Sequence, residues 1–493
     1  MGRIRDEAEI KQEGMRVLKS FDWAALVPIA LVPVVLLVPV ALLVPGWSTS
    51  PLAAQQDTIP GVELRLLYEA EFQPALAVQP FLGRLGGETL ASRVEAIIAR
   101  DLRYSDRFEV MDALPASLIA DEIDYQLWDQ LGAVWLVSGS LEGAGSGFVL
   151  VLELHDVVYG EIRERGRFPV PDAGDEDFRL AVHIAADAIV EWIYNEPGMA
   201  ASRIAFSRRT EDGNQDLYLI DSDGENFRRL THYNDLTMSP SWSADGTSIA
   251  YSSRHITGLP RLYELDLETL SEKPLEAGRN GDHFTPAFSP NGRDVAFAIT
   301  GGSRSGIFYY DWERQCCLTQ VSGGRWDDIS PTYSPDGRRI AFNSNRLGTP
   351  FPQIYVMPAT GGEAELVSPY LHGREGYYTS PDWAPVGDHV AFHGRVGRRG
   401  RYNILVADVS DRGRRLRQLT WEGNNEDPSW APDGRHLVFI GRRDWGTGLM
   451  VVDTATGTYR MLLRGIDVRL PDWSPPLGPD LDGAGPKSLR DGA

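Results

Sequence analysis

Three histidines stand shortly before prolines that recur through the second half of the chain. His232, His283 and His372 lie 8, 3 and 9 residues before the nearest of these prolines. Imidazole nitrogens are common ligands of divalent metals, so three histidines that met at one place could hold an ion. The unequal spacings favour different depths in the fold. We therefore expect structural or surface roles for the three side chains, and no bound cofactor.

A serine nucleophile of the hydrolase type would stand in a Gly-x-Ser-x-Gly motif between a strand and a helix. The sequence contains no such motif. The parts described below also leave no segment to house a hydrolase domain. We expect no catalytic residues and no enzymatic activity.

The element that must position the histidines is a repeat. Residues 330–342 read Ser-Pro-Thr-Tyr-Ser-Pro-Asp-Gly-Arg-Arg-Ile-Ala-Phe, and near copies recur every 43 to 50 residues. The Pro-Asp-Gly type of turn favours a chain reversal, and the flanking aromatic and β-prone residues favour two antiparallel strands. The prolines that mark the six copies are Pro240, Pro286, Pro331, Pro381, Pro428 and Pro471.

Each copy is followed by a second predicted strand pair, so one repeat supplies four strands. Four-stranded units repeated at this period are typical of a β-propeller. The last copy stops after its first strand at residues 470–475, whereas residues 203–206 at the other end resemble the second strand of a copy and lack a first. We expect these two segments to pair, closing a six-bladed ring over residues 202–476.

A smaller domain is predicted over residues 75–197, where strands alternate with helices. Apolar residues recur at helical spacing in residues 87–102 and 178–192, and a further helix is expected within residues 121–131. Strands are expected at residues 75–78, 108–110, 133–139 and 148–155. The fold class is therefore multidomain, with a small α/β domain followed by an all-β six-bladed β-propeller.

The amino terminus is typical of an exported protein. Residues 24–45 form an uncharged apolar run with four prolines, followed by small residues up to Ala54. This favours a signal peptide over residues 1–54 with cleavage near Ala54, but a run of this length can also remain as a membrane anchor. A start at Met15 instead of Met1 would give a more typical basic n-region. In either case we expect the rest of the chain outside the cytoplasm, reaching the membrane only through this signal or anchor.

The net charge and the cysteine content limit which partners and which disulfides we expect. The net charge of −21 and the pI near 4.9 argue against a nucleic-acid partner, and we expect a monomer. The only two cysteines, Cys316 and Cys317, are adjacent on a predicted strand, where neighbouring side chains point to opposite faces. We expect them to be unpaired. The tail over residues 477–493 has the composition of a disordered segment.

The order of export signal, α/β domain and six-bladed propeller resembles the TolB family, the periplasmic component of the Tol-Pal system. The resemblance covers roughly residues 61–478 and rests on the repeated Ser-Pro-Asp-Gly turns, on residues 471–475, and on Trp128, His183 and Asp187 in the α/β domain. It implies a scaffold that links inner-membrane Tol proteins to the peptidoglycan-associated lipoprotein Pal, for envelope integrity and cell division. The alternative is a metal-dependent propeller lyase or another carbohydrate-active periplasmic propeller.

The resemblance implies a TolA-binding stretch just ahead of the α/β domain, in a mobile segment over residues 55–74. The matching residues are Val62, Leu64, Leu66 and Phe72, of which the first three alternate with charged residues. Such alternation suits a segment that adds to a sheet edge, but also an ordinary first strand. The stretch departs from the family's usual small and acidic pattern, so its position is better defined than its partner.

The resemblance also implies a Pal-binding patch at one mouth of the propeller channel, in the loops just before each Pro-x-Trp strand. Loops on a rigid ring are well placed to carry binding. Some of these residues are expected to be ordinary solvated turn residues. The corresponding residues are His283, Thr285, Asp328, Ser330, Thr379, Ser380, Glu426 and Asp427.

Overall fold

The computed structural model describes residues 72–478, except 85–86, 113, 115–122, 146, 276, 303, 371–375 and 397–399. The proposed signal or anchor over residues 1–54, the segment 55–71 and the tail from residue 479 lie outside the described residues. Among the helices of the described ranges, none is both long and apolar enough to cross a bilayer.

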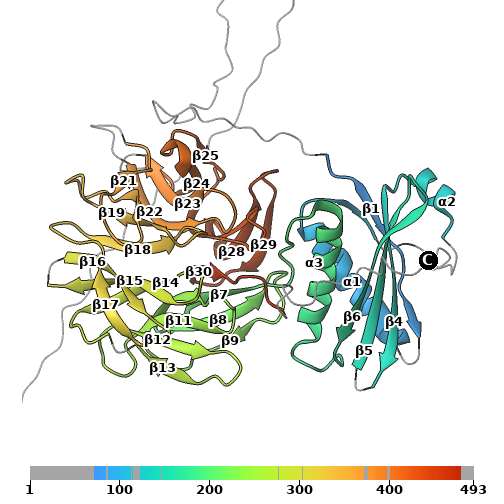
Figure 1. Cartoon of the computed structure of the whole chain (residues 1–493), viewed down its shortest axis with the longest axis horizontal. Coiled ribbons are helices and arrows are strands. Elements are labelled where there is room, and N and C mark those ends of the chain that lie inside the picture. The colour runs from blue at the N-terminus through green and yellow to red at the C-terminus, as the bar shows by residue number, and fades with distance from the viewer. Residues whose placement is uncertain are drawn as a thin grey trace, which may run out of the picture. The chain divides into compact units, whose positions relative to one another are not determined.

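A six-stranded sheet forms the amino-terminal α/β domain, with the two long helices on one face and a short helix on the other (Figure 1). The strand order is β3-β1-β4-β5-β6, with β2 beside β4. Strand β1 is parallel to β3 and β4, whereas β4, β5 and β6 are antiparallel. The elements are β1 (Ala75–Val78), β2 (Leu82–Arg84), α1 (Glu88–Tyr104), β3 (Glu109–Met111), α2 (Tyr125–Gln130), β4 (Trp135–Ala144), β5 (Gly147–Asp156), β6 (Glu161–Val170) and α3 (Phe178–Tyr194).

The apolar faces of α1 and α3 pack on this sheet and form the core of the α/β domain. Val94 and Ile98 of α1 and Val182 of α3 are fully buried in one cluster with strand residues. Helix α3 ends where Asn195 adopts a left-handed conformation with φ 53°. Strand β6 was not predicted, because this edge strand is largely exposed and rich in charged residues. Its hydrophobic pattern is therefore weak.

Six four-stranded sheets form the propeller (Figure 1). The innermost strands are β10 (Thr237–Trp242), β14 (Asp282–Phe288), β18 (Asp328–Tyr333), β22 (Gly376–Trp383), β26 (Asn424–Trp430) and β30 (Val468–Trp473). The second strands are β7 (Arg203–Arg209), β11 (Ser248–Ser253), β15 (Asp294–Gly301), β19 (Arg339–Ser344), β23 (His389–Val396) and β27 (His436–Arg443). The third strands are β8 (Gln215–Asp221), β12 (Arg261–Asp266), β16 (Arg304–Asp311), β20 (Gln353–Pro358), β24 (Asn403–Asp408) and β28 (Gly446–Asp453). The outer strands are β9 (Arg228–Arg229), β13 (Glu272–Pro274), β17 (Cys316–Gln320), β21 (Glu365–Leu366), β25 (Leu416–Gln418) and β29 (Tyr459–Arg464), and a 3-10 turn η2 (Val409–Asp411) follows β24.

The two ends of the propeller sequence share one blade, as the incomplete first and last repeats predicted. The sheet order is β30-β7-β8-β9, and β30 runs antiparallel to β7 with Trp473 opposite Ile204. The Trp473 indole donates a hydrogen bond of 2.7 Å to the Ser202 hydroxyl. The ring is therefore closed by the most distant parts of the propeller sequence, and the expected six-bladed fold is confirmed.

The expectation that the two cysteines are unpaired was wrong, because Cys316 and Cys317 form a disulfide. They lie on the outer strand β17, where the pairing with β16 shifts register. Cys317 has φ 68°, so the regular alternation of side chains is broken there. Side chains alternate between the two faces of a sheet only where the backbone is extended, and the sequence does not predict the local departure at Cys317.

Trp473 tests the ring closure. The side chain is 5% exposed, and its removal also leaves the Ser202 hydroxyl without its indole partner. We expect Trp473→Ala to lower the free energy of unfolding of the propeller by about 3–5 kcal/mol, as for other buried large side chains. Denaturant unfolding followed by far-UV circular dichroism would measure this loss. Tyr159→Ala is the control, because Tyr159 is 80% exposed; equal effects of both changes would contradict the closure.

The cysteine pair should add little to stability. A disulfide stabilises mainly by restricting the unfolded chain, and a bond between adjacent residues closes almost no loop. We expect Cys316→Ser/Cys317→Ser to unfold within about 2 °C of the wild type in calorimetry. Thiol titration of the denatured wild type should find free thiols only after reduction. A large drop in Tm would show that the bond has a structural role.

Candidate functional site

The centre of the propeller is a channel lined by all six innermost strands. Its cavity has a volume of about 370 Å³. The walls are built from the Pro-x-aromatic part of every repeat together with the residue before each proline. The repeat identified in the sequence therefore brings six chemically varied positions into one ring.

The residue before each proline has the same unusual backbone conformation. These residues have φ between 47° and 55°, in the left-handed region that non-glycine residues seldom occupy. At each of these positions the innermost strand holds one extra residue relative to its neighbour, which is a β-bulge. The bulge interrupts the pairing and re-aims the side chains that follow. The six residues are Ser239, Thr285, Ser330, Ser380, Asp427 and Leu470.

In four of the six repeats, the side chain after the proline ties its blade to the next one. Asp472 accepts a hydrogen bond of 2.8 Å from the Trp242 backbone amide, and Asp382 accepts one of 2.7 Å from that of Trp430. The Thr332 hydroxyl accepts a hydrogen bond of 3.2 Å from the Trp383 backbone amide, and the Ser429 hydroxyl accepts one of 3.0 Å from that of Trp473.

Asp382 and Asp472 titrate far from the usual range of an aspartate. Burial raises the pKa of Asp382 to about 6, although the Trp430 amide and the Thr332 hydroxyl lower it. Burial also raises the pKa of Asp472 to about 8, and repulsion by Asp382 adds to the shift. At neutral pH the Asp472 carboxyl group thus keeps its proton, whereas Asp382, with the lower pKa, is mostly ionised.

Four of the residues predicted to bind Pal lie together on the channel rim. Thr285, Ser330, Ser380 and Asp427 are all bulge residues and all line the cavity. They interact in neighbouring pairs. The Ser330 amide donates to the Thr285 hydroxyl at 3.2 Å, and the Ser380 hydroxyl donates to the Asp427 carboxylate at 2.9 Å.

The other four predicted residues lie deeper or beside the rim. His283 and Asp328 are almost fully buried, and Asp328 pairs with Arg346 at 3.0 Å. Thr379 and Glu426 are half-buried and bind Asn343 and Arg442. The number of residues before each proline did not predict which side chains line the cavity. The bulge residues line it, whereas the residues that precede each bulge are buried or half-buried.

The structure does not bring the three histidines of the metal hypothesis into one ligand set. His232 is exposed, His283 is buried, and His372 lies outside the described residues. Burial lowers the pKa of His283 to about 4, with a further contribution from Arg261, so this imidazole is uncharged at neutral pH. In the described part of the chain, the groups close enough to share an ion lie elsewhere, around His183 and His436. Three of their aspartates are already paired with arginines and the fourth, Asp101, is bonded to His183, so we interpret them as ion-pair clusters.

The predicted TolA-binding stretch is described only at its end. Val62, Leu64 and Leu66 lie outside the described residues. Phe72 has 80% of its surface exposed, which is unusual for a side chain of this size and polarity. The hypothesis for this stretch stays a prediction.

The residues that link the blades were missed in the sequence. Asp382, Asp472, Thr332 and Ser429 occupy the middle position of the Pro-x-Trp or Pro-x-Tyr motifs, where the residue varies from copy to copy. The signal was the type of residue found there. It is polar in five copies and Ala287 in the sixth, whereas a strand facing only a dry core would favour apolar side chains.

The Asp472 carboxyl group gives the propeller a pH-dependent stability. Its pKa of about 8 in the folded protein lies above the unfolded value of about 3.9, so the folded state binds this proton more tightly. That contribution is complete below pH 4 and is lost as the pH rises through 8. We expect the Tm of Asp472→Asn to rise relative to the wild type between pH 5 and pH 9. Asp444→Asn, at an exposed position, should keep a constant difference; a constant difference for Asp472→Asn as well would contradict the assignment.

Comparisons with known proteins agree with this architecture. The profile of the TolB beta propeller domain matches residues 190–477, and that of the TolB amino-terminal domain matches residues 68–162. The Tol-Pal system protein TolB of Anaeromyxobacter sp. (strain K) is 31% identical over 242 residues, which are 47% of this chain and 54% of that protein. The Tol-Pal system protein TolB of Methylococcus capsulatus is 32% identical over 184 residues, 36% of this chain and 42% of that protein. The chain thus spans about half the length of the curated relatives it matches.

A solved structure extends the similarity to both domains. The crystal structure of TolB from Acinetobacter baumannii is 26% identical, with a TM-score of 0.69, and covers 82% of this chain and 97% of that one. Profile matches across the propeller and the α/β domain, together with this structural similarity, establish that the chain belongs to the TolB family.

Proposed function

We propose that this chain is a periplasmic protein-binding scaffold of the Tol-Pal system, with no reaction of its own. It would link inner-membrane Tol proteins of the TolA type to a Pal-type lipoprotein, for envelope integrity and cell division. Membership of the TolB family supports this function. The observation that carries the proposed Pal site is the ring of bulged residues on the channel rim.

The rim suits recognition of a folded partner for two physical reasons. Its backbone is held by the bulges and by the links between blades, so little conformational entropy is lost when a partner binds. Thr285, Ser330, Ser380 and Asp427 also offer hydroxyl and carboxylate groups to a loop that reaches the rim. We propose that these four residues contact the Pal-type protein, with Glu426 and Thr379 at the margin.

The buried members of the predicted patch have a supporting role in this proposal. His283 Nε2 donates a hydrogen bond of 3.2 Å to the Arg279 carbonyl, and the His283 carbonyl accepts one of 2.7 Å from the Ser252 hydroxyl. Asp328 is held by Arg346. These bonds position the strand segments that lead to Thr285 and Ser330. We therefore propose indirect effects when His283 or Asp328 is changed.

A metal-dependent lyase is the less favoured alternative. A lyase site would need charged or metal-bound groups that converge on a substrate, and His283 is a buried, uncharged imidazole in the wall. The described channel offers hydroxyl groups, the protonated Asp472 carboxyl group and prolines instead. This chemistry fits protein recognition better than proton abstraction.

The rim hypothesis is tested by two arginine substitutions. We expect Thr285→Arg and Ser330→Arg to weaken binding of the purified chain to the Pal-type lipoprotein domain by at least about 100-fold, because a long charged side chain would fill the rim. Isothermal titration calorimetry would measure the change. Glu268→Arg, at an exposed turn far along the blade from the channel, should bind like the wild type. No binding by the folded wild type would overturn the proposed partner, and unchanged binding by both rim variants would overturn the proposed site.

A further inference from the structure

Two clusters of charged side chains join the α/β domain to the propeller. We call the first the helix cluster, which contains Arg100, Asp101, Arg179 and His183 of the α/β domain and Arg203, Asp221, Asp223 and Glu225 of the propeller. We call the second the turn cluster, which contains Asp106 of the α/β domain and Asp433, Arg435, His436, Asp453 and Arg460 of the propeller. Each cluster has one histidine at its centre.

In the helix cluster, His183 of α3 lies between carboxylates of both domains. Its Nδ1 is 2.6 Å from Asp101 of α1. Its Nε2 is buried, has no hydrogen-bond partner among the described residues, and lies 3.9 Å from Asp221 and 4.0 Å from Asp223 of the propeller. The imidazole therefore faces negative charge on both sides.

Arginines bind the same propeller aspartates. Arg179 pairs with Asp221 at 3.2 Å and also with Asp223. Arg100 pairs with Asp223 and with Glu225, the latter at 3.3 Å, and Arg203 pairs with Asp221 at 3.3 Å. The propeller aspartates are thus already paired with guanidinium groups, whereas Asp101 is bonded to His183.

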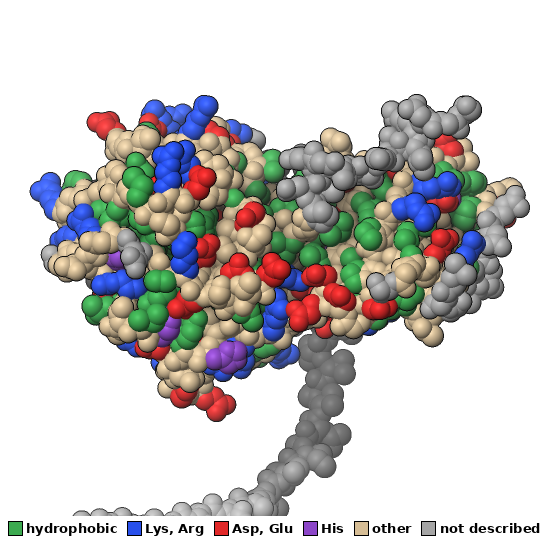
Figure 2. All heavy atoms as spheres, turned by 60° about the horizontal axis from the view of Figure 1, so that its bottom comes forward, with side chains coloured by type: hydrophobic (Ala, Val, Ile, Leu, Met, Phe, Trp, Pro, Cys, Tyr) green, Lys and Arg blue, Asp and Glu red, His purple; other side chains and the backbone are tan. Residues whose placement is uncertain are grey.

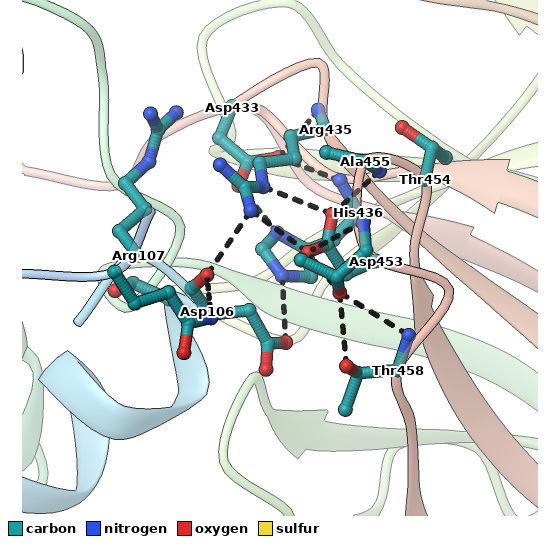
Figure 3. Close-up of polar contacts among 12 residues, drawn as sticks. Asp106, Arg107, Asp433, Arg435, His436, Asp453, Thr454, Ala455 and Thr458 are labelled. Atoms are coloured by element: carbon teal, nitrogen blue, oxygen red, sulfur yellow. Dashed lines mark hydrogen bonds and ion pairs between the residues drawn. The ribbon is translucent and has the colours of Figure 1, made fainter. Parts of the chain in front are cut away.

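In the turn cluster, His436 at the start of β27 spans the two domains in the same way (Figure 3). Its Nδ1 is 2.6 Å from Asp433 of its own blade, and its Nε2 is 3.1 Å from Asp106 of the α/β domain. Figure 3 also shows Arg435 between the Asp106 carbonyl, at 3.0 Å, and the Asp453 carboxylate, at 2.8 Å. Both ring nitrogens face carboxylate oxygens, so both must carry protons to donate hydrogen bonds.

Each cluster needs one further proton for its charges to balance. In the turn cluster His436 carries it, and in the helix cluster His183 holds it in the hydrogen bond to Asp101, whose own pKa is raised by burial. The helix cluster has four carboxylates against three guanidinium groups, and the turn cluster has three carboxylates against two. One imidazolium in each makes up the difference. Asp187, one turn beyond His183 on α3, bonds to the amides of Ala200 and Ala201 and adds negative potential when ionised.

The direction of both titrations agrees with this balance. Burial by itself lowers the pKa of His183, but attraction to Asp101, Asp223 and Asp221 outweighs burial and holds that pKa above its usual value. Burial likewise lowers the pKa of His436, and Asp433 and Asp106 more than offset burial although Arg460 opposes them. Loss of either proton would leave buried carboxylates facing each other across the domain boundary, which is costly.

We propose that His183 and His436 form a pH-dependent latch between the two domains. With both imidazoles charged, the clusters hold the α/β domain against the propeller turns that contain Asp223 and Asp433. A group with a raised pKa in the docked state stabilises that state fully below the free value near 6.5, and this stabilisation is lost as the pH rises through the raised value. The latch therefore weakens in mildly alkaline conditions and tightens in mildly acidic ones. The inference does not depend on the identity of any partner.

Hydrogen exchange of the full chain tests the latch. The readout is the amide exchange of the turns at residues 221–226 and 433–436, corrected for the intrinsic effect of pH, at pH 6.0 and pH 9.0. We expect the corrected protection of both turns to fall by at least about tenfold at the higher pH, since one pH unit beyond a shifted pKa corresponds to a tenfold change in the coupled equilibrium. Protection in the inner strand β18, remote from both clusters, should stay constant.

Two controls keep the test decisive. His183→Gln/His436→Gln cannot titrate and should lose the pH dependence, whereas His232→Gln, at an exposed histidine, should keep it. If the double variant does not fold, the pKa values of the two histidines in the wild type, measured by NMR, decide. Values above 6.5 for both are expected. Constant corrected protection in the wild type, or histidine pKa values below 6.5, would overturn the proposal.

Discussion

The structure depends on how each innermost strand is fixed to the next around the channel. A propeller blade packs its faces against its neighbours, but a dry apolar contact does not by itself set the height of one strand relative to another. At four of the six junctions between blades, the side chain that follows the marker proline accepts a hydrogen bond from the backbone amide of a tryptophan in the next blade, as Asp382 does for Trp430 and Asp472 does for Trp242. These bonds fix the channel residues of neighbouring blades relative to one another. The closing pair of β30 and β7 completes the ring, so the rim exists only while both ends of the propeller sequence are joined.

The same strands connect the proposed partner site with the contact between the domains. Asp427 is the middle residue of β26, in the channel wall, whereas Asp433 lies in the turn beyond the end of that strand, where it meets the α/β domain through His436. The strand that carries this channel residue therefore leads directly into the turn that contacts the α/β domain. Figure 2 shows that charged side chains of both signs cover the viewed face, with acidic ones gathered near its middle.

Buried charge is handled in two different ways in this acidic protein, whose net charge is −21. In the channel, Asp382 and Asp472 lack cationic partners, and their pKa values rise toward neutral pH. Between the domains, aspartates are paired with arginines and histidines, and the pKa of Asp433 falls to about 2 despite its burial, chiefly through attraction to His436. The first arrangement favours neutral carboxyl groups that donate and accept hydrogen bonds. The second keeps full charges, and it makes domain docking sensitive to the protonation of two histidines.

The sequence by itself determined the fold class, the number of blades and the way the ring closes. These features follow from local chemistry. Turn residues reverse the chain, the number of repeats gives the number of blades, and the incomplete first and last repeats indicate which strands pair. The tertiary structure decided which residues reach the channel. Thr285 and His283 are two residues apart, yet a bulge leaves one on the rim and buries the other. It also decided the cysteine pairing, through the positive φ of Cys317, and the contacts of His183 and His436, whose partners lie far away in the chain. Such features depend on backbone exceptions and on long-range proximity, and neither leaves a periodic pattern in the sequence.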